Sequence, residues 1–332
     1  MTVITLDLSK IIIENKVNQT QETILNNEPL EQSLHVICVV SNPCLYKKRY
    51  ELAIKFIRKM LKTDNIILYV VELVYGNEDF YITNSNNPRH LQIRTKTAPL
   101  WHKENLINMG VKKLLPPEWK AFAWIDADIE FDSSTWALDT LKVLNGYKDV
   151  VQLFSHAVDM DNNEYSMNIF SGFGYNYEMG KKYVFGGLDY WHPGFAWACT
   201  RKAYEKMNGL YEVSILGSGD HNMCYSYIFN ASESLNHQVH PDYLQTLEEY
   251  QQRACKLRLG YIPGVIRHFF HGSKKNRKYK ERWQILVNHQ FSPMKHITRN
   301  ADGLIIPTPE CPKELLQDIL KYFQERNEDE SY

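Results

Sequence analysis

The sequence predicts an α/β protein with a mixed, mainly parallel central sheet flanked by helices. Three observations indicate this: strand-type apolar runs alternate with helix-type segments, the composition is that of a globular protein, and one apolar run ends in a row of acids. Alternation of strands and helices is typical of parallel sheets with right-handed crossovers. With 332 residues, 44% of them hydrophobic and 23% charged, the chain can bury a substantial core as one large or two ordinary domains.

The expected elements follow from the spacing of apolar residues. Apolar runs of strand length stop at Ser41-Asn42-Pro43 and at Tyr75-Gly76-Asn77, which are turn signals. Between these runs, apolar residues recur every three or four positions, the helical period. In order, we expect a strand at 35–40, a helix at 46–61, a strand at 66–74, a helix at 101–114, a strand at 121–131 and a closing amphipathic helix at 313–326. The second half is less regular and rich in Gly, Tyr, Phe and His, as expected of loops that shape a pocket.

The strand expected at 121–131 begins with an apolar run and ends in acids at every second position: Asp126, Asp128, Glu130 and Asp132. Because side chains alternate along a strand, all four carboxylates would project from one face. Like charges this close repel unless a cation lies among them, and a divalent cation held by carboxylate oxygens is the natural candidate. Open α/β sheets bind ligands at the carboxyl ends of their strands. The pattern therefore predicts a metal-chelated, phosphate-bearing ligand.

The Asp-x-Asp spacing alone is a weak signal. Asp159-Met-Asp161 also matches it, but polar residues follow and predict a turn. A calcium-binding EF-hand loop is excluded as well. Counted from Asp126, the positions that this loop requires as Gly and Glu hold Phe131 and Ala137.

Two further segments carry polar groups suited to ligand binding or catalysis. On the helix at 101–114, Glu104 and Asn108 lie one turn apart, where a nucleotide or plain solvent would satisfy them. Farther on, a Gly-Ser-Gly run allows close approach of the backbone to a ligand, and Asp220 and His221 follow it directly. A general base would be useful on such a tight loop, and the alternative is a turn with a solvated Asp.

The last segment pairs two histidines with a basic cluster. His268 and His271 lie three residues apart, and six Lys and Arg residues follow within 274–282. An imidazole would complete a metal shell, and Lys274 or Arg277 would neutralise phosphate oxygens. A basic run is usually a solvated surface, but a carboxylate metal site in the same chain favours the phosphate interpretation.

In their order, these motifs resemble those of metal-dependent GT-A glycosyltransferases, in particular the β-1,4-galactosyltransferase and polypeptide N-acetylgalactosaminyltransferase-type catalytic domains. The resemblance spans roughly 35–285 and implies a single catalytic domain with a GT-A (Rossmann-like) fold. Two departures are Pro193 in place of the first of two paired glycines and His221 in place of the second of two paired acids. The matching segments are Asp126-Ala-Asp128, Asn108-Met-Gly110, Pro193-Gly194 through Gly219-Asp220, and Arg267-His268.

The resemblance implies transfer of a hexosyl or N-acetylhexosaminyl group from a nucleotide-sugar donor, with a UDP-sugar expected, to a hydroxyl of a glycan or glycoconjugate. It implies Mn²⁺ or Mg²⁺ as cofactor and Asp220 as the base of an inverting displacement, with His221 as the alternative base. The implied metal ligands are Asp126, Asp128 and either His268 or His271. The implied donor-binding residues are Ser41, Asn42, Lys103, Asn108, Asp126, Gly194, Lys274 and Arg277.

The same interpretation divides the chain. Residues 1–33, which are mainly polar, would be a peripheral extension. The domain would occupy 34–300, with a nucleotide-binding half at 34–132 and a half for acceptor and metal at 133–300. Residues 301–332 would hold the closing helix and a frayed acidic tail.

Composition excludes several other classes of protein. A net charge of −1 gives no electrostatic basis for nucleic-acid binding, and no apolar stretch approaches the roughly 20 residues of a membrane span. Six cysteines without a CxxC pair indicate reduced thiols, and the first residues lack a signal-type apolar core, so we expect a cytoplasmic protein. Two alternative functions remain: a metal-dependent nucleotidyltransferase or phosphohydrolase, which would hold two close metals, and an inactive glycan-binding module on the same scaffold.

Overall fold

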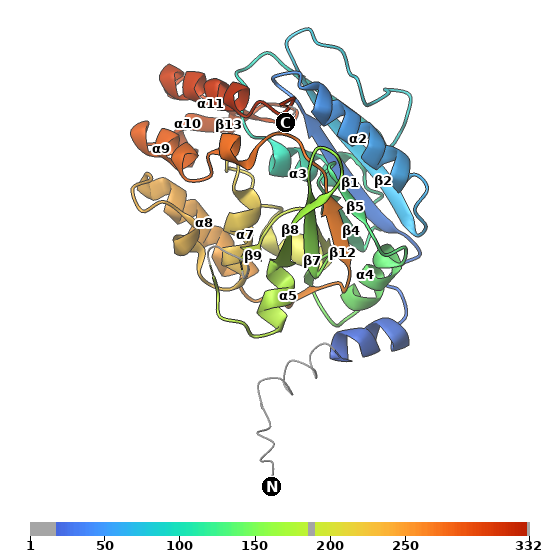
Figure 1. Ribbon diagram of the computed structural model, residues 1–332. Helices are drawn as coiled ribbons and strands as arrows, with labels where there is room; N and C mark the ends of the chain where they lie inside the picture. Colours follow the sequence, from blue (N-terminus) through green and yellow to red (C-terminus); the bar gives the residue numbers. More distant parts are fainter. Residues whose placement is uncertain (1–17, 185–189, 331–332) are drawn as a thin grey trace.

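The computed structural model describes residues 18–184 and 190–330 (Figure 1). Its centre is a seven-stranded sheet in which only one strand, β10, runs antiparallel to its neighbours. The predicted α/β class with a mixed, mainly parallel central sheet is confirmed. In sheet order the strands are β11 (Leu259–Tyr261), β6 (Val150–Gln152), β10 (Ala196–Thr200), β4 (Ala121–Ile125), β1 (Leu34–Ser41), β2 (Ile66–Tyr75) and β3 (His90–Thr95).

A second sheet and a short hairpin complete the strands of the described residues. The second sheet brings chain segments from 129 and from 268 side by side, which matters for the site below. Its order is β5 (Ile129–Phe131), β12 (Val265–His268), β7 (His156–Met160), β8 (Ser166–Gly172) and β9 (Trp191–His192); the hairpin pairs β13 (Ile297–Arg299) with β14 (Ile305–Pro307).

Helices cover both faces of the central sheet (Figure 1). Beyond an unlabelled helix at 18–26, the α-helices are α2 (Lys47–Met60), α3 (Lys103–Leu114), α4 (Trp136–Leu144), α5 (Phe173–Glu178), α6 (Arg201–Met207), α7 (Gly219–Tyr227), α8 (Pro241–Ala254), α9 (Glu281–Asn288), α10 (Pro293–His296) and α11 (Lys313–Glu325). Two 3₁₀ turns are η1 (Ala231–Ser234) and η2 (Lys274–Arg277). No helix among the described residues is both long and apolar enough to cross a membrane.

Two apolar clusters sandwich the sheet, as the side-chain alternation of its strands dictates. In β4, Phe122 and Trp124 join the cluster beneath α3, α6, α7 and α8, whereas Ala121, Ala123 and Ile125 face the cluster beneath α2 and α4. Nine of the ten side chains at 36–40 in β1 and 121–125 in β4 are buried, because helices cover both faces of these strands. The strand ends, which carry polar residues, are left to form the site.

The predicted strand at 121–131 is wrong in its second half. The central strand ends at Ile125, the chain turns through 126–128, and β5 then joins the other sheet. The four acids therefore do not share one face. Glu130 pairs with Lys59 at the surface, and Asp132 pairs with Arg267.

The predicted frayed tail is also wrong for residues 326–330. Glu328 is 1% exposed, and Asp329 accepts hydrogen bonds from the backbone N–H groups of Lys47 and Lys48 at the start of α2. The tail therefore packs against the carboxyl end of β1. At the other end of the chain, residues 18–33 dock on the domain, with Asn27 bonded to the Lys142 carbonyl.

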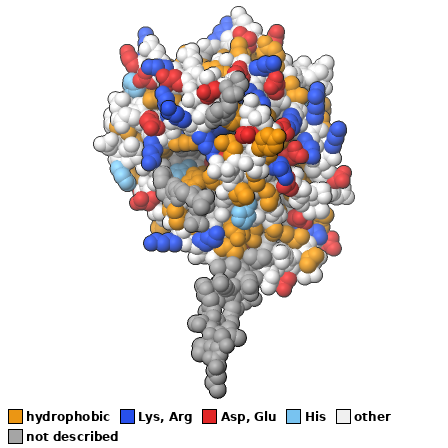
Figure 2. All heavy atoms as spheres, in the orientation of Figure 1, with side chains coloured by type: hydrophobic (Ala, Val, Ile, Leu, Met, Phe, Trp, Pro, Cys, Tyr) orange, Lys and Arg blue, Asp and Glu red, His pale blue; other side chains and the backbone are white. Residues whose placement is uncertain are grey.

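Over the face shown in Figure 2, Lys and Arg side chains are interspersed with Asp and Glu side chains. This mixture agrees with the net charge of −1. All six cysteines are free thiols.

Candidate functional site

A cavity of about 900 Å³ opens at the carboxyl ends of β1 and β4. Ser41 and Asn42 follow β1, and Asp126 follows β4, so two parallel strands deliver polar groups to one edge. Because β10 is antiparallel, its first residues lie at this same edge, where Gly194 lines the wall. Twelve of the thirteen predicted site residues line this cavity: Ser41, Asn42, Lys103, Asp126, Asp128, Gly194, Asp220, His221, His268, His271, Lys274 and Arg277.

Asp128, His268 and His271 form a group that could hold a metal ion, with one ligand atom from each lying within 4.8 Å of the others. The Asp128 Oδ2 atom is 2.9 Å from His271 Nε2 and 3.8 Å from His268 Nε2. Antiparallel pairing of β12 with β5 brings them together, because it sets His268 opposite Ile129. The sequence left the choice between the two histidines open, and the structure places both beside Asp128.

The chemistry of this group fits a cation. Asp128 Oδ1 is buried and has no hydrogen-bond partner among the described residues. Because buried carboxylate oxygens normally have a partner, a bound cation would satisfy this atom. Burial lowers the pKa of His268, and this favours the neutral imidazole that a metal requires. Arg277 Nη2 lies 2.7 Å from His271 Nε2, so a cationic side chain already borders the ligand atoms.

Asp126 does not join the metal group in this structure, contrary to its predicted dual role. Its Oδ1 atom lies 2.6 Å from Lys103 Nζ, and the same ammonium lies 3.0 Å from Asp220 Oδ2. Lys103 thus links the acid after β4 to the acid on α7. Burial acts to lower the pKa of Lys103, but Asp126, Asp220 and Glu104 outweigh it and hold that pKa well above its ordinary value. Burial raises the pKa of Asp126 to about 6 although Lys103 opposes the shift.

Asp220 lies in the first turn of α7, directly after Ser218 and Gly219. Its Oδ1 atom is buried without a hydrogen-bond partner among the described residues, whereas Oδ2 is held by Lys103. A Cβ atom at Gly219 would lie 2.4 Å from the Glu104 carboxyl group, so a larger residue there would require the Glu104 side chain to move. His221 lines the cavity as well, and burial, aided by Arg282, lowers its pKa to about 4.

A strained backbone position lies beside Gly194. Phe195 has a φ of 80°, which is uncommon for a large side chain and costs on the order of 1–3 kcal/mol. Its carbonyl accepts the Asp126 N–H at 2.8 Å, and its ring packs between His192 and His268 at centroid distances of 4.1 and 4.6 Å. The strained residue therefore connects the turn after β4 with the metal group.

The remaining predicted donor-binding residues differ in how firmly they are fixed. Asn42 is bonded through its side chain to the backbone of Tyr46 in both directions, at 2.8 and 3.0 Å, so it shapes the turn after β1. Ser41 Oγ lies 3.1 Å from the Tyr75 hydroxyl. Lys274 pairs with Asp159 and lies over the Phe170 ring.

Asn108, which was predicted to bind the donor, is the one predicted site residue that does not line the cavity. Its amide nitrogen donates to the Leu210 carbonyl at 3.0 Å and to Glu212 at 2.6 Å. Its amide oxygen accepts from the Tyr204 hydroxyl at 3.0 Å and from the Leu210 N–H at 2.9 Å. With its side chain fully used, Asn108 anchors the loop after α6 to α3.

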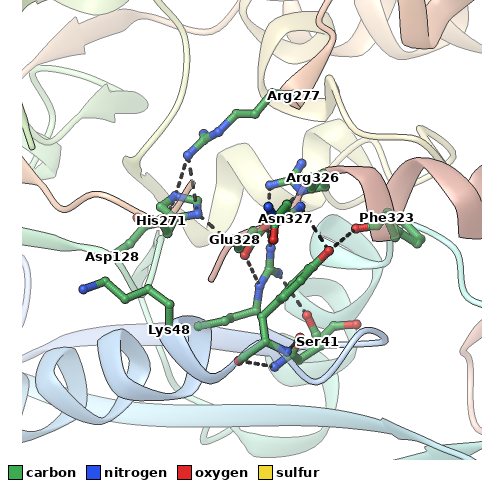
Figure 3. A network of polar contacts seen from close by, with 12 residues as sticks. Ser41, Lys48, Asp128, His271, Arg277, Phe323, Arg326, Asn327 and Glu328 are labelled. Carbon is green, nitrogen blue, oxygen red and sulfur yellow. Dashed lines mark hydrogen bonds and ion pairs between the residues drawn. The ribbon is translucent and has the colours of Figure 1, made fainter. Parts of the chain in front are cut away.

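Sequence reasoning missed several residues of this site. Asp159 was assigned to a polar turn, yet it lies in β7 and its Oδ1 atom is 2.8 Å from His268 Nδ1. Glu328 was assigned to a frayed tail, yet it pairs with Arg49 and Arg326 and lies beside His271 (Figure 3). The alternation of Asp159 with apolar neighbours was the available signal in the first case; for Glu328 the local sequence offers none.

No protein-family model matches this chain, and no curated protein sequence matches it. Solved structures show similarity at 10% sequence identity. A mannosyltransferase from Pyrobaculum calidifontis, in complex with GDP-Man and Mn²⁺, has a TM-score of 0.43 over 96% of this chain and 82% of its own. The catalytic domain of Drosophila β1,4-galactosyltransferase 7 with xylobiose has a TM-score of 0.35, with 87% and 99% covered.

A mutant of the same Drosophila enzyme, with manganese, UDP-Gal and xylobiose, has 10% identity and a TM-score of 0.36 over 86% of this chain and 98% of its own. By their names these proteins are glycosyltransferases, the class whose motif order the sequence resembles. At these TM-scores the similarity assigns neither donor nor acceptor to this chain.

Proposed function

We propose that this protein is a metal-dependent glycosyltransferase that moves a sugar from a nucleotide-sugar donor, a UDP-sugar in the first instance, to a hydroxyl of a glycan or glycoconjugate. The observation that carries the proposal is the convergence of two different groups in one cavity. Asp128, His268 and His271 form a candidate cation site. Asp220 lines the same cavity, and its Oδ1 atom has no hydrogen-bond partner among the described residues. Leaving-group activation and proton removal need these two kinds of site side by side.

The donor would be held through its phosphates. Mn²⁺ or Mg²⁺ bound by Asp128, His268 and His271 would stabilise the negative charge that develops on the leaving diphosphate. Arg277 borders these ligand atoms and Lys274 lines the same cavity, and in this proposal both would neutralise phosphate oxygens.

The identity of the metal is open to a direct test. Two imidazoles and one carboxylate suit Mn²⁺ better than Mg²⁺, which prefers oxygen ligands. The same donor set also binds Fe²⁺ or Zn²⁺ in proteins. We therefore place Mn²⁺ first and include the other three ions in the assay below.

Asp220 is the base that we favour. Lys103 Nζ holds its Oδ2 atom at 3.0 Å, which fixes the carboxylate and leaves Oδ1 to accept the proton of an acceptor hydroxyl. His221 remains the alternative, because a pKa of about 4 leaves its imidazole neutral at pH 7. Either base acting directly on the acceptor inverts the configuration at the anomeric carbon. Gly194, whose position lies next to Asp220 Oδ2, would border the transferred sugar.

The alternative of a nucleotidyltransferase or phosphohydrolase predicts two close metals. Within residues 18–184 and 190–330, one group of three metal-binding side chains is present. Asp126, the acid nearest to that group in the sequence, is engaged by Lys103. These observations favour the single-metal chemistry of sugar transfer.

The test is nucleotide release from a panel of UDP- and GDP-sugars, with each metal and with EDTA, for wild type and Asp128→Asn. We expect release from one donor that EDTA abolishes and that Asp128→Asn lowers by about 100-fold or more, because the variant loses a charged ligand of the metal.

Asp132→Asn is the matched control. Asp132 belongs to the same row of acids but pairs with Arg267 outside the cavity, so this variant should retain activity. If no sugar nucleotide is bound or turned over in the presence of acceptor glycans, or if both variants behave alike, the proposal is wrong.

A further inference from the structure

The two histidines of the candidate metal site share an arrangement that their positions in the sequence do not reveal. Each turns its Nε2 atom toward Asp128 Oδ2 and its Nδ1 atom toward a buried carboxylate. For His268 the carboxylate is Asp159, at 2.8 Å; for His271 it is Glu328, at 3.6 Å. The two carboxylates come from opposite sides of the site, β7 and the tail after α11.

Asp159 is placed by strand pairing. Strands β7 and β12 run parallel, and their register sets Asp159 beside His268. The Asp159 residue is 3% exposed, so its charge needs a partner. Its Oδ1 atom lies 2.8 Å from His268 Nδ1 and its Oδ2 atom pairs with the Lys274 ammonium. This geometry suits a carboxylate that accepts the His268 Nδ1–H.

Glu328 is placed by the tail (Figure 3). Arg49 Nε donates to its Oε2 atom at 2.8 Å and Arg326 Nε donates to its Oε1 atom at 2.7 Å. Gly272, one residue after His271, has a φ of +86°, and a Cβ there would lie 2.9 Å from the Asn327 carbonyl oxygen. The tail thus packs directly on the turn that carries His271.

We propose that Asp159 and Glu328 are positioning residues of the metal site. Asp159 accepts the Nδ1–H of His268 at 2.8 Å, and Glu328, 3.6 Å from His271 Nδ1, attracts the Nδ1–H of that ring through its charge. The Nε2 lone pair of each histidine then faces the position beside Asp128 where the cation binds. A neutral imidazole exists in two tautomers, and only the Nδ1–H form presents Nε2 as a ligand. This inference rests on the metal site of the proposed function and adds two residues to it.

Both carboxylates also make ion pairs that have nothing to do with a metal. Asp159 pairs with Lys274, and Glu328 pairs with Arg49 and Arg326. A purely structural role would make the variants less stable without changing the affinity of a folded protein for metal. Metal affinity measured on folded apoprotein therefore separates the two roles.

The experiment is a Mn²⁺ titration of the full chain, without nucleotide, followed by electron paramagnetic resonance of the free ion. The variants are Asp159→Asn and Glu328→Gln, whose amides can donate to Nδ1 and so favour the wrong tautomer. We expect each to bind Mn²⁺ about 10- to 100-fold more weakly than wild type. Circular dichroism and thermal unfolding of the apoproteins show that each is folded.

Two controls each remove a negative charge nearby. Asp161→Asn changes a residue two positions from Asp159, where the side-chain oxygen accepts from the Asn163 and Tyr165 N–H groups as an amide oxygen also does. Asp329→Asn retains one acceptor oxygen, so it keeps one of the two hydrogen bonds with the Lys47 and Lys48 N–H groups at the start of α2. Both controls should bind Mn²⁺ within about twofold of wild type, because neither carboxylate touches a histidine.

The outcomes are distinct. If wild type does not bind Mn²⁺, the proposed metal site itself is wrong, and this inference falls with it. If wild type binds Mn²⁺ and the two variants bind it as tightly, or lose no more affinity than their controls, the positioning role is overturned while the proposed function stands.

A second measurement needs no variant and covers the case in which one does not fold. In Zn²⁺-loaded wild type labelled with ¹⁵N-histidine, His268 and His271 should each show an Nδ1–H proton protected from exchange. Rapidly exchanging Nδ1–H protons at both histidines would contradict the proposal.

Discussion

Glu104 lies on α3, where the start of α7 packs against it, and its protonation depends on this position. It is 2% exposed, and burial, followed by the Asp220 charge, raises its pKa from 4.5 to about 8. At neutral pH the folded protein therefore holds a proton there that the unfolded chain releases. Stability from this group is fully present below pH 4.5 and is lost as the pH rises through about 8.

Glu104→Gln should accordingly change the pH dependence of stability. The amide resembles the protonated carboxyl group and cannot ionise. Between pH 5 and pH 9 the variant should gain stability relative to wild type, by an amount on the order of 1–3 kcal/mol. Urea unfolding at several pH values measures this difference. The exposed Glu310→Gln should show no such trend, and a Glu104→Gln curve parallel to wild type would contradict the assignment.

For single residues, the sequence predicted the site best where the residue type and its neighbours indicate one chemical role. A carboxylate after a buried strand, a tight Gly-Ser-Gly-Asp loop and two histidines near basic residues were predicted to lie together, and the structure brings them into one cavity. Asp159 and Asn108 were misassigned because their partners are distant in sequence. His268 lies 109 residues from Asp159, and Glu212 lies 104 residues from Asn108.

Among the elements, the chain from β4 to β5 shows how a turn redirects neighbouring acids. Two residues past the end of β4, the chain leaves the central sheet, and β5 pairs with β12. A period-two pattern predicts one face only while the strand continues. Asp126 and Asp128 therefore have different partners although they are two residues apart. Asp126 pairs with Lys103, and Asp128 pairs with His271.

The turn after β12 supports a prediction on backbone conformation. Gly272 and Gly146 share a φ of +86°, but only Gly272 has backbone atoms of the tail within contact distance of a new Cβ. Gly146→Ala should cost about 1 kcal/mol from strain alone, whereas Gly272→Ala should cost about 1–3 kcal/mol more, because the tail must move.

Chemical unfolding of the two variants compares these costs. If Gly272→Ala lowers the free energy of unfolding no more than Gly146→Ala does, the tail moves away from the new Cβ at little energetic cost. Because their φ values are equal, any difference between the two reports the contact with Asn327 and Glu328.

At the scale of the whole molecule, we expect the fold to form without a bound metal. The two apolar clusters that enclose the central sheet contain none of Asp128, His268 and His271. Removal of metal with EDTA should therefore leave the far-UV circular dichroism and cooperative unfolding intact.

Added Mn²⁺ should stabilise the folded protein by mass action, by about 2.7 kcal/mol at a concentration 100 times the dissociation constant. Thermal unfolding with and without Mn²⁺ measures the shift, and Asp128→Asn should abolish most of it. An apoprotein without a cooperative transition would mean that the ion is structural.

The first half of the fold was predictable because its strands and helices are continuous in sequence and buried on both faces. The later strands are only two to seven residues long, and several pair with segments more than 100 residues away. Such short elements carry little periodicity, and their pairing is fixed by tertiary contacts. The division into a nucleotide-binding half at 34–132 and a half for acceptor and metal at 133–300 stays a prediction. The tail within 301–332, expected to be separate, lines the cavity through Arg326 and Glu328.

The cap on α2 also bears on the order in which the molecule assembles. The N–H groups of Lys47 and Lys48 are satisfied by Asp329, which lies 282 and 281 residues farther along the chain. Closing so large a loop is entropically slow, so this contact belongs to the last steps of folding. Interactions that form after the transition state slow unfolding and leave the folding rate nearly unchanged. The contact between the tail and α2 would therefore lower the unfolding rate and lengthen the lifetime of the native state.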